Sequence, residues 1–166
     1  MQNHYNYVYD NITNTYNFVT KNLFLYRVAF VIDETFSSIA GEDIPNIFQL
    51  VVEKASENLE PFDSKVSKTI ENIIERFFKN SENSLVYVCS EEKNKAVARH
   101  KIFDRWYRNS KHKDFIVKID NIIKINIDGL KGQKLYTSFM FHKQNSNYEY
   151  LIEIYHQIEQ VLNEEK

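Results

Sequence analysis

Three strand-like segments lie within the first 32 residues, and only a few residues connect each segment to the next. Residues 5–9, 15–20 and 23–32 are rich in aromatic and β-branched side chains, and Asp10-Asn11 has the composition of a turn. Parallel strands need a crossover connection of about a dozen residues or more, so these segments can pair only in antiparallel fashion. The sequence therefore predicts an N-terminal antiparallel meander.

The rest of the chain mixes predicted helices with predicted strands. Residues 47–52 fit both a strand and a helix, and of the two we predict a strand. The segment from Leu85 to Cys89 lacks alternation, which predicts a strand buried on both faces. The other predicted elements are a helix from Asp63 or Ser64 to Lys79, a helix from Lys95 to Asn109, strands at 116–127 and 135–142, a bulge or bend at Asp120-Asn121, a turn at Asp128-Gly129 and a C-terminal helix opened by a capping box at Ser146–Glu149.

This order of elements, roughly β-β-β-β-α-β-α-β-β-α, groups the strands early and places about three helices late. Such an order is typical of the α+β class with a largely antiparallel sheet, and not of a doubly wound parallel sheet. The chain has 166 residues, which suffices for one core without disulfides or metals. Eleven Tyr and twelve Phe, with only three Gly and two Pro, favour strands and a packed core. We therefore expect a single α+β domain over residues 1–166.

The composition also bears on where the protein works. Cys89 is the one cysteine, so no intramolecular disulfide can form, which suits a reducing cytosol. The N-terminal residues show no charged segment followed by an apolar stretch, as a secretory signal would. The longest apolar run, Val28 to Ile32, is far shorter than the roughly 18 residues of a membrane span. We therefore expect a cytoplasmic protein with no membrane partner.

Motifs of common enzymes and metalloproteins are absent from the sequence. Lys95 stands where a phosphatase loop opened by Cys89 would need arginine, no glycine lies between them, and Glu91-Glu92 would repel an anion. We interpret Cys89 as a buried thiol. The histidines lack the spacing of metal ligands, and the glycines form no phosphate-binding loop. The sequence therefore predicts no catalytic residue, metal or cofactor, and it favours a protein that is not an enzyme.

Arg99 is the most unusual residue of the predicted helix at 95–109. On a helical wheel it falls within the apolar arc, between Trp106 and Phe103, and His100 lies at the edge of that arc next to Tyr107. A guanidinium on an apolar face must find partners, because an unpaired buried charge is costly. Two interpretations are open. Arg99 either pairs with core groups and fastens the helix to the sheet, or it faces a pocket and meets an anionic ligand.

The opposite face of this helix is strongly basic. Residues 93–118 carry a net charge of +7, whereas the whole chain carries −2. Lys101, Arg105 and Arg108 form a basic strip beside Trp106 and Tyr107. Basic residues interleaved with aromatic ones are able to bind phosphate backbones and stack on bases, and an acidic protein could use the same strip. A third reading is a solvated surface without a special role.

Several short sequence motifs resemble those of one family. They are Tyr16-Asn-Phe18 followed by Tyr26–Phe30, the run Asn83–Ser90, Ala98-Arg-His100 with Phe103–Tyr107, and Phe141-His-Lys143. With these motifs the chain resembles a family of small uncharacterised proteins from Bacteroidota, classed as a domain of unknown function. The resemblance implies a bacterial, cytosolic, single-domain protein. It implies no activity and no catalytic residues.

Two functional hypotheses from different classes follow from the sequence. The first is a non-enzymatic bacterial interaction protein, of the antitoxin, immunity or defence-accessory type, that binds a protein partner through the basic and aromatic surface. The second is a nucleic-acid-binding protein or a metal-independent ribonuclease-like toxin, with Arg99, His100, Arg105 and Tyr107 as its site. A small-ligand pocket at Arg99 is a third hypothesis. Exposed edge strands would also allow a homodimer.

Overall fold

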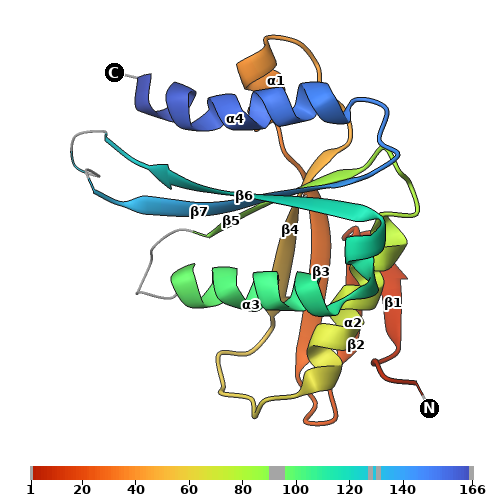
Figure 1. Cartoon of the computed structure of the whole chain (residues 1–166). Coiled ribbons are helices and arrows are strands. Elements are labelled where there is room, and N and C mark those ends of the chain that lie inside the picture. Colours follow the sequence, from red (N-terminus) through yellow and green to blue (C-terminus); the bar gives the residue numbers. More distant parts are fainter. Residues whose placement is uncertain (1, 90–95, 127–128, 130–131, 165–166) are drawn as a thin grey trace. The chain divides into compact units, whose positions relative to one another are not determined.

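The chain is an α+β protein, as the order of predicted elements indicates, and its described residues form a seven-stranded, mostly antiparallel sheet and four α-helices (Figure 1). The computed structural model describes residues 2–89, 96–126, 129 and 132–164. The strand order in the sheet is β1-β2-β3-β4-β5-β7-β6. The elements are β1 (Tyr7–Asp10), β2 (Thr15–Val19), β3 (Leu25–Ile32), α1 (Thr35–Ala40), β4 (Ile47–Lys54), α2 (Ser64–Phe77), β5 (Ser84–Cys89), α3 (Ala96–Asn109), the 3-10 helix η2 (Lys111–Asp114), β6 (Ile116–Lys124), β7 (Lys134–His142) and α4 (Tyr148–Glu164).

The chain divides into two compact units, which are described separately below. The first unit contains residues 1–31 and 49–79, and thus β1, β2, α2 and most of β3 and β4. The second unit contains residues 32–48 and 80–166, and thus α1, β5, α3, η2, β6, β7 and α4.

The first unit is built on the N-terminal meander, which confirms its prediction. β1 pairs antiparallel with β2, and β2 pairs antiparallel with β3, so that Phe18 lies opposite both Tyr7 and Tyr26. The rings of Phe18 and Tyr26 stack at 5.2 Å. Ile73 of α2 is fully buried in the same cluster as Phe18 and Val28. The apolar stripe of α2 therefore packs on an aromatic sheet face.

The loop between β4 and α2 is tied to the meander by two carboxylates. Asp63 caps α2 by accepting a hydrogen bond from the backbone N–H of Lys65 at 2.9 Å, as the sequence predicts, and it also accepts the Tyr5 hydroxyl. Glu60 accepts the hydroxyls of Thr20 (2.7 Å) and Tyr26 (2.8 Å). These bonds fix the loop in one conformation without any glycine.

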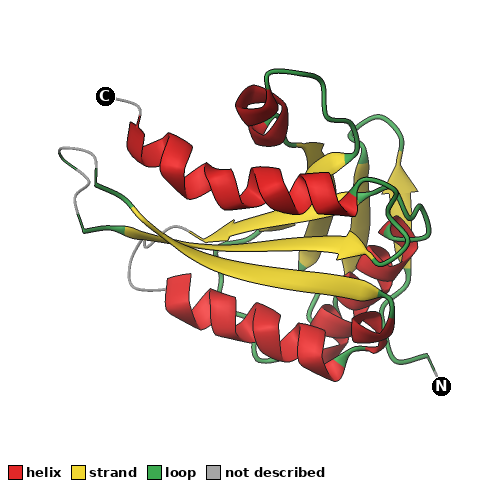
Figure 2. Ribbon diagram, turned by 45° about the horizontal axis from the view of Figure 1, so that its top comes forward, coloured by secondary structure: helices red, strands yellow, loops and turns green. Residues whose placement is uncertain are grey.

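The second unit contains three neighbouring strands, with β7 between β5 and β6. Figure 2 shows these strands with α3 on one face and α4 on the other. On the α4 side, Phe139 of β7 and Tyr155 of α4 are fully buried in one cluster, and their rings stack at 5.4 Å. Thr137 Oγ1 and the Tyr155 hydroxyl share a buried hydrogen bond of 2.8 Å. On the α3 side, the rings of Tyr87 and Phe103 stack at 3.9 Å.

Four details of the sequence-based prediction are wrong. The short helix α1 was not among the predicted elements, and it ends at Gly41, whose φ of 71° is left-handed. Of the two alternatives predicted at Asp120-Asn121, a bulge or a bend, the bulge is wrong, because the register of β6 with β7 runs without a break through both residues. Val88 in β5 is 46% exposed, so that strand is not buried on both faces along its length. The Ser146 hydroxyl binds Glu82 at 2.7 Å, and α4 begins at Tyr148 without the expected Ser146 capping box.

Candidate functional site

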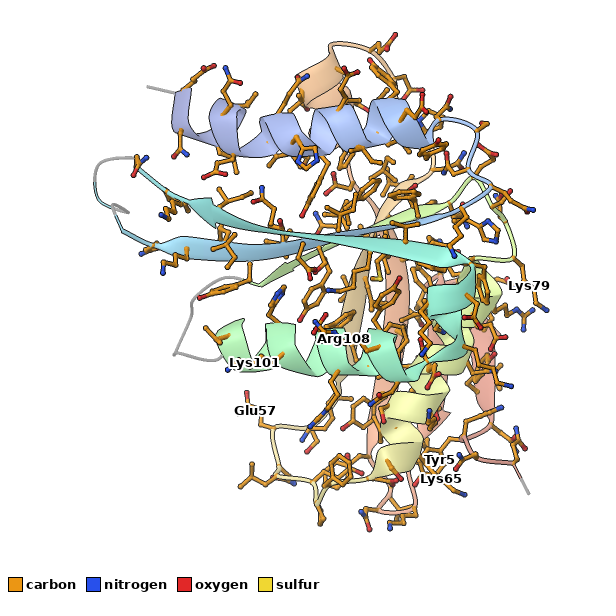
Figure 3. All side chains as sticks on the ribbon, viewed as in Figure 1. Tyr5, Glu57, Lys65, Lys79, Lys101 and Arg108 are labelled. Atoms are coloured by element: carbon orange, nitrogen blue, oxygen red, sulfur yellow. The ribbon has the colours of Figure 1, made fainter. Side chains whose placement is uncertain are left out.

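The outer face of α3 carries the predicted basic strip. Lys101, Arg105 and Arg108 follow a spacing of four and three residues, which places them on one helix face, and all three are exposed. Figure 3 labels Lys101 and Arg108, whose side chains belong to α3. Arg108 Nε lies 2.9 Å from Asp104 Oδ2, whereas neither Lys101 nor Arg105 makes an ion pair within the described residues. Beyond the helix, exposed Lys111 and Lys113 extend the basic surface.

The aromatic residues of α3 face inward. Trp106 packs edge-on against Phe103 at 5.8 Å and lies 5.4 Å from the His112 ring. The Tyr107 hydroxyl donates a hydrogen bond of 2.6 Å to the backbone oxygen of Ile116 at the start of β6. Burial raises the pKa of Tyr107. The structure thus separates the sequence-predicted residues into a basic outer face and an aromatic inner face.

His100 also lies on the inner side of α3. Its ring is 5.5 Å from that of Tyr136 in β7. His100 Nδ1 and Trp106 Nε1 are buried, and neither makes a hydrogen bond within the described part of the chain. The side chains of Arg99 and Cys89 lie outside the described residues, so both interpretations of Arg99 remain predictions and Cys89 remains a predicted buried thiol. The predicted turn at Asp128-Gly129 falls in part on Asp128, which also lies outside them.

A buried lysine, which the sequence reasoning missed, holds α3 on the sheet. The Lys118 side chain in β6 is only 2% exposed, and its ammonium contacts the carboxylates of Asp104 (3.5 Å) and Asp120. Asp120 also accepts the hydroxyl of Ser138 in β7 at 2.6 Å. Lys118 lies 6.0 Å from the centroid of the Tyr107 ring. A chain of opposite charges therefore runs from the exposed Arg108 through Asp104 to the buried Lys118. It ends at Asp120, whose side chain is exposed.

The electrostatics of this network favour its ionised form. Burial alone would raise the pKa of Asp120, but the hydrogen bonds from Lys118 and Ser138, together with nearby charges, outweigh burial and lower it. The positive charges of Lys118 and His100 act in the same direction. Asp120 is thus a stable carboxylate partner of Lys118, which compensates the cost of burying that ammonium.

Two kinds of feature are absent from the described residues, namely a metal-binding cluster and a membrane-spanning helix. Within residues 2–89, 96–126, 129 and 132–164, no three side chains of His, Cys, Asp or Glu come together in a way that could hold a metal ion. None of the helices in these ranges combines the length and the apolar character needed to cross a membrane.

The fold and this site define a class: an α+β protein in which a helix with a basic outer face is clamped on an antiparallel sheet by a buried lysine. A family model described as "Family of unknown function (DUF6169)" matches residues 62–158, which is more than half of the chain. The chain belongs to this family. The comparison with curated proteins gives no significant match, and the comparison with solved structures gives none either.

Proposed function

We propose that the protein is a non-enzymatic interaction protein whose α3 outer face binds an acidic surface of a protein partner. The observation that carries the proposal is the exposed basic strip of Lys101, Arg105 and Arg108 on a helix whose inner face is firmly fixed. Like charges on one helix face repel one another and destabilise the isolated helix slightly, so an acidic partner would relieve a strain that the chain otherwise retains. Roles of the antitoxin, immunity or defence-accessory type fit such a surface.

The inward orientation of the aromatic residues favours a protein over a nucleic acid. Binding of single-stranded nucleic acid relies on aromatic rings that are free to stack on bases. Trp106 packs against Phe103 and His112, and the Tyr107 hydroxyl is engaged by Ile116. Neither ring projects from the basic outer face. What remains on that face is charge, which is what an acidic protein surface requires.

Two further features argue for the helix face as the docking element. β6 lies at the edge of the sheet, and its Lys118 and Asp120 point inward beneath α3. Inward-pointing charges on an edge strand discourage pairing with another chain.

In the first unit, the N-terminus of α2 is occupied by the Asp63 carboxylate. A negative group at that position repels phosphate, so this helix end is unsuited to a nucleotide or a phosphorylated coenzyme.

A capture experiment with matched variants tests the proposal. The immobilised wild-type chain, the double variant Lys101→Glu/Arg105→Glu and the control Lys79→Glu/Lys124→Glu are each exposed to lysate of the producing cell. The control reverses two exposed lysines outside α3, so its net charge equals that of the α3 variant. We expect one stoichiometric protein partner with the wild type and the control, about tenfold weaker retention with the α3 variant, and cross-links from α3 to acidic residues of that partner.

The same experiment separates the two functional classes. Recovery of no stoichiometric protein, or equal retention of the partner by the α3 variant, overturns the proposal. Nucleic acid that is captured by the wild type and lost from the α3 variant also overturns it, in favour of the nucleic-acid hypothesis. Thermal unfolding of each variant checks that the fold is intact. We expect no loss of stability in the α3 variant, because Lys101 and Arg105 make no ion pair within the described residues.

A further inference from the structure

A recess opens in the second unit at the N-terminal end of α4, away from the basic face of α3. It has a volume of about 250 Å³ and is formed by three loops together with the first turn of α4. The residues that line it are Glu42, Asp43, Ile44, Pro45, Asn46, Glu82, Asn145, Asn147, Tyr150 and Leu151. Pockets for drug-sized ligands span roughly 300–1,000 Å³, so this recess suits one small group and not a large cofactor.

The walls of the recess are fixed by hydrogen bonds. Gly41 closes α1 with a left-handed φ of 71°, a conformation in which a residue with a Cβ is strained. The next loop is held by Ser37, whose hydroxyl accepts the backbone N–H of Ile44 at 2.9 Å. Asn46, also left-handed with φ of 64°, accepts the backbone N–H of Ser84 at 2.8 Å. The recess is therefore formed before any ligand arrives, which lowers the entropic cost of binding.

The opposite wall is equally well fixed. The Asn145 side chain is 3% exposed, and its amide donates to the Glu82 backbone oxygen (3.2 Å) and to the Ser84 hydroxyl (3.3 Å). Asn145 Oδ1 accepts the backbone N–H of Asn147 at 2.9 Å. The Glu82 carboxylate accepts the Ser146 hydroxyl at 2.7 Å. The Glu82 carboxylate thus serves the turn before α4, and the other two carboxylates of the lining, Glu42 and Asp43, are exposed.

The charge of the recess is one-sided. None of the described residues that line it is cationic, whereas Glu42, Asp43 and Glu82 are acidic. The Tyr150 hydroxyl donates to Glu42 Oε1 at 2.6 Å and so orients that carboxylate. A carboxylate has about four lone-pair sites, so Glu42 is able to hold Tyr150 and still accept further donors. Beside these acceptors, Ile44, Pro45 and Leu151 add an apolar surface.

We propose that this recess binds a small organic cation, namely a guanidinium or ammonium group on a short aliphatic stem. The carboxylates of Glu42 and Asp43 accept its N–H donors, and the stem lies against Ile44, Pro45 and Leu151. Such a group occurs in free amines and in the arginine or lysine side chain of a peptide. Both sources present the same chemistry to the recess. The volume accommodates one such group.

Binding assays with charged and uncharged probes test this assignment. Calorimetric titration of the full chain uses arginine amide and, as the second source, a blocked tripeptide with one central arginine. Citrulline amide, acetylated at its α-amino group so that it carries no charge, serves as the probe of nearly equal shape. We expect saturable binding of at least one arginine probe and binding at least about tenfold weaker for citrulline amide, since charge-assisted hydrogen bonds are the stronger ones. Preference for the tripeptide identifies a protein ligand, and preference for arginine amide identifies a free amine.

Conservative variants locate the site. Glu42→Gln/Asp43→Asn preserves shape and removes two charges, and we expect it to weaken the arginine probe about tenfold or more. Glu164→Gln, at the other end of α4, is the matched control and should bind as the wild type does. If the wild type binds neither arginine probe, or citrulline amide binds equally well, the assignment is overturned. Retained affinity in the double variant likewise overturns it, and amide shifts at Ile44 and Tyr150 in NMR spectra verify that the wild-type signal comes from this recess.

Discussion

The Lys118 ammonium lies 3.5 Å from the carboxylate of Asp104. Lys118 belongs to the edge strand β6, yet its side chain is only 2% exposed. Asp104 reaches in the other direction to the exposed Arg108, at 2.9 Å. A single carboxylate on α3 thus joins a buried cation to a surface cation. The position of the basic outer face relative to the sheet depends on this contact.

Replacement of Lys118 by methionine should destabilise the protein markedly. The substitution keeps most of the apolar stem and removes the charge, which leaves Asp104 and Asp120 without their shared cation. We expect the free energy of unfolding to fall by about 2–3 kcal/mol, below the full cost of breaking a buried pair because both carboxylates are partly exposed. Urea unfolding measures the loss. Lys124→Met, at an exposed position of the same strand, should change stability by less than about 0.5 kcal/mol. Equal effects of the two variants would contradict a bridging role for Lys118.

The two ion pairs of Asp104 should differ in strength. A double-mutant cycle with Asp104→Asn and Lys118→Met should give a coupling of about 1–2 kcal/mol, because the lysine is buried. The cycle with Asp104→Asn and Arg108→Gln should give about 0.5 kcal/mol or less, because the Arg108 side chain is 75% exposed. Only the second coupling should vanish in high salt. A larger coupling to Arg108 than to Lys118 would assign the clamp to the surface pair.

The fold was predictable where local pattern alone decides it. The N-terminal meander follows from short connections, and α2 follows from the spacing of its apolar residues and from Asp63 at its cap. The helix α1 was missed because its six residues are too short for a periodic signal, although Gly41 marks its end. The bulge or bend expected at Asp120-Asn121 falls on a charged residue within an apolar strand. The structure gives that residue a different role, as the partner of Lys118.

The two faces of α3 were predictable from the sequence, but the ion pairs beneath the helix were not. Charge density identified Lys101, Arg105 and Arg108 from the sequence, because exposed basic residues need no tertiary partner to be recognised. Lys118 was not identified, because its pairing with Asp104, 14 residues before it on α3, depends on tertiary packing, although Asp120 lies only two residues after it on the same strand. Sequence pattern does not fix the register that brings Asp120 opposite Ser138. A lysine within the apolar run 116–124 was nevertheless a signal that an acid must lie nearby.

Removal of the Tyr5 hydroxyl should change the pH dependence of stability. The hydrogen bond from Tyr5 is the largest of the effects that lower the pKa of Asp63. A carboxyl whose pKa is lower in the folded state stabilises the protein above its unfolded value of 3.8, and this contribution is lost as the pH falls through the folded value. In Tyr5→Phe we expect a stability loss of about 1 kcal/mol at neutral pH, small because the pair is solvent-accessible, and a smaller loss below about pH 4.

Thermal unfolding of Tyr5→Phe between pH 3 and pH 7 tests this expectation. Tyr9→Phe is the control, since the Tyr9 hydroxyl binds only the exposed Asn14 side chain, at 3.2 Å. The control should follow the wild-type pH profile. A Tyr5→Phe profile parallel to the wild type at every pH would mean that the hydroxyl acts without coupling to Asp63.

At alkaline pH, Tyr155 should govern the stability of the second unit. Burial raises the pKa of Tyr155 to about 12, whereas the ordinary value is 10.0. Because the folded value is the higher one, this tyrosine contributes stability that is complete below pH 10 and is lost as the pH rises toward 12. Tyr155→Phe removes the buried bond to Thr137 and should cost about 1–2 kcal/mol at neutral pH. The variant should also lose stability less steeply above pH 10, which urea unfolding monitored by circular dichroism measures. Tyr9→Phe, at an exposed position, should retain the wild-type slope, and an unchanged slope in Tyr155→Phe would show that other tyrosines control alkaline unfolding.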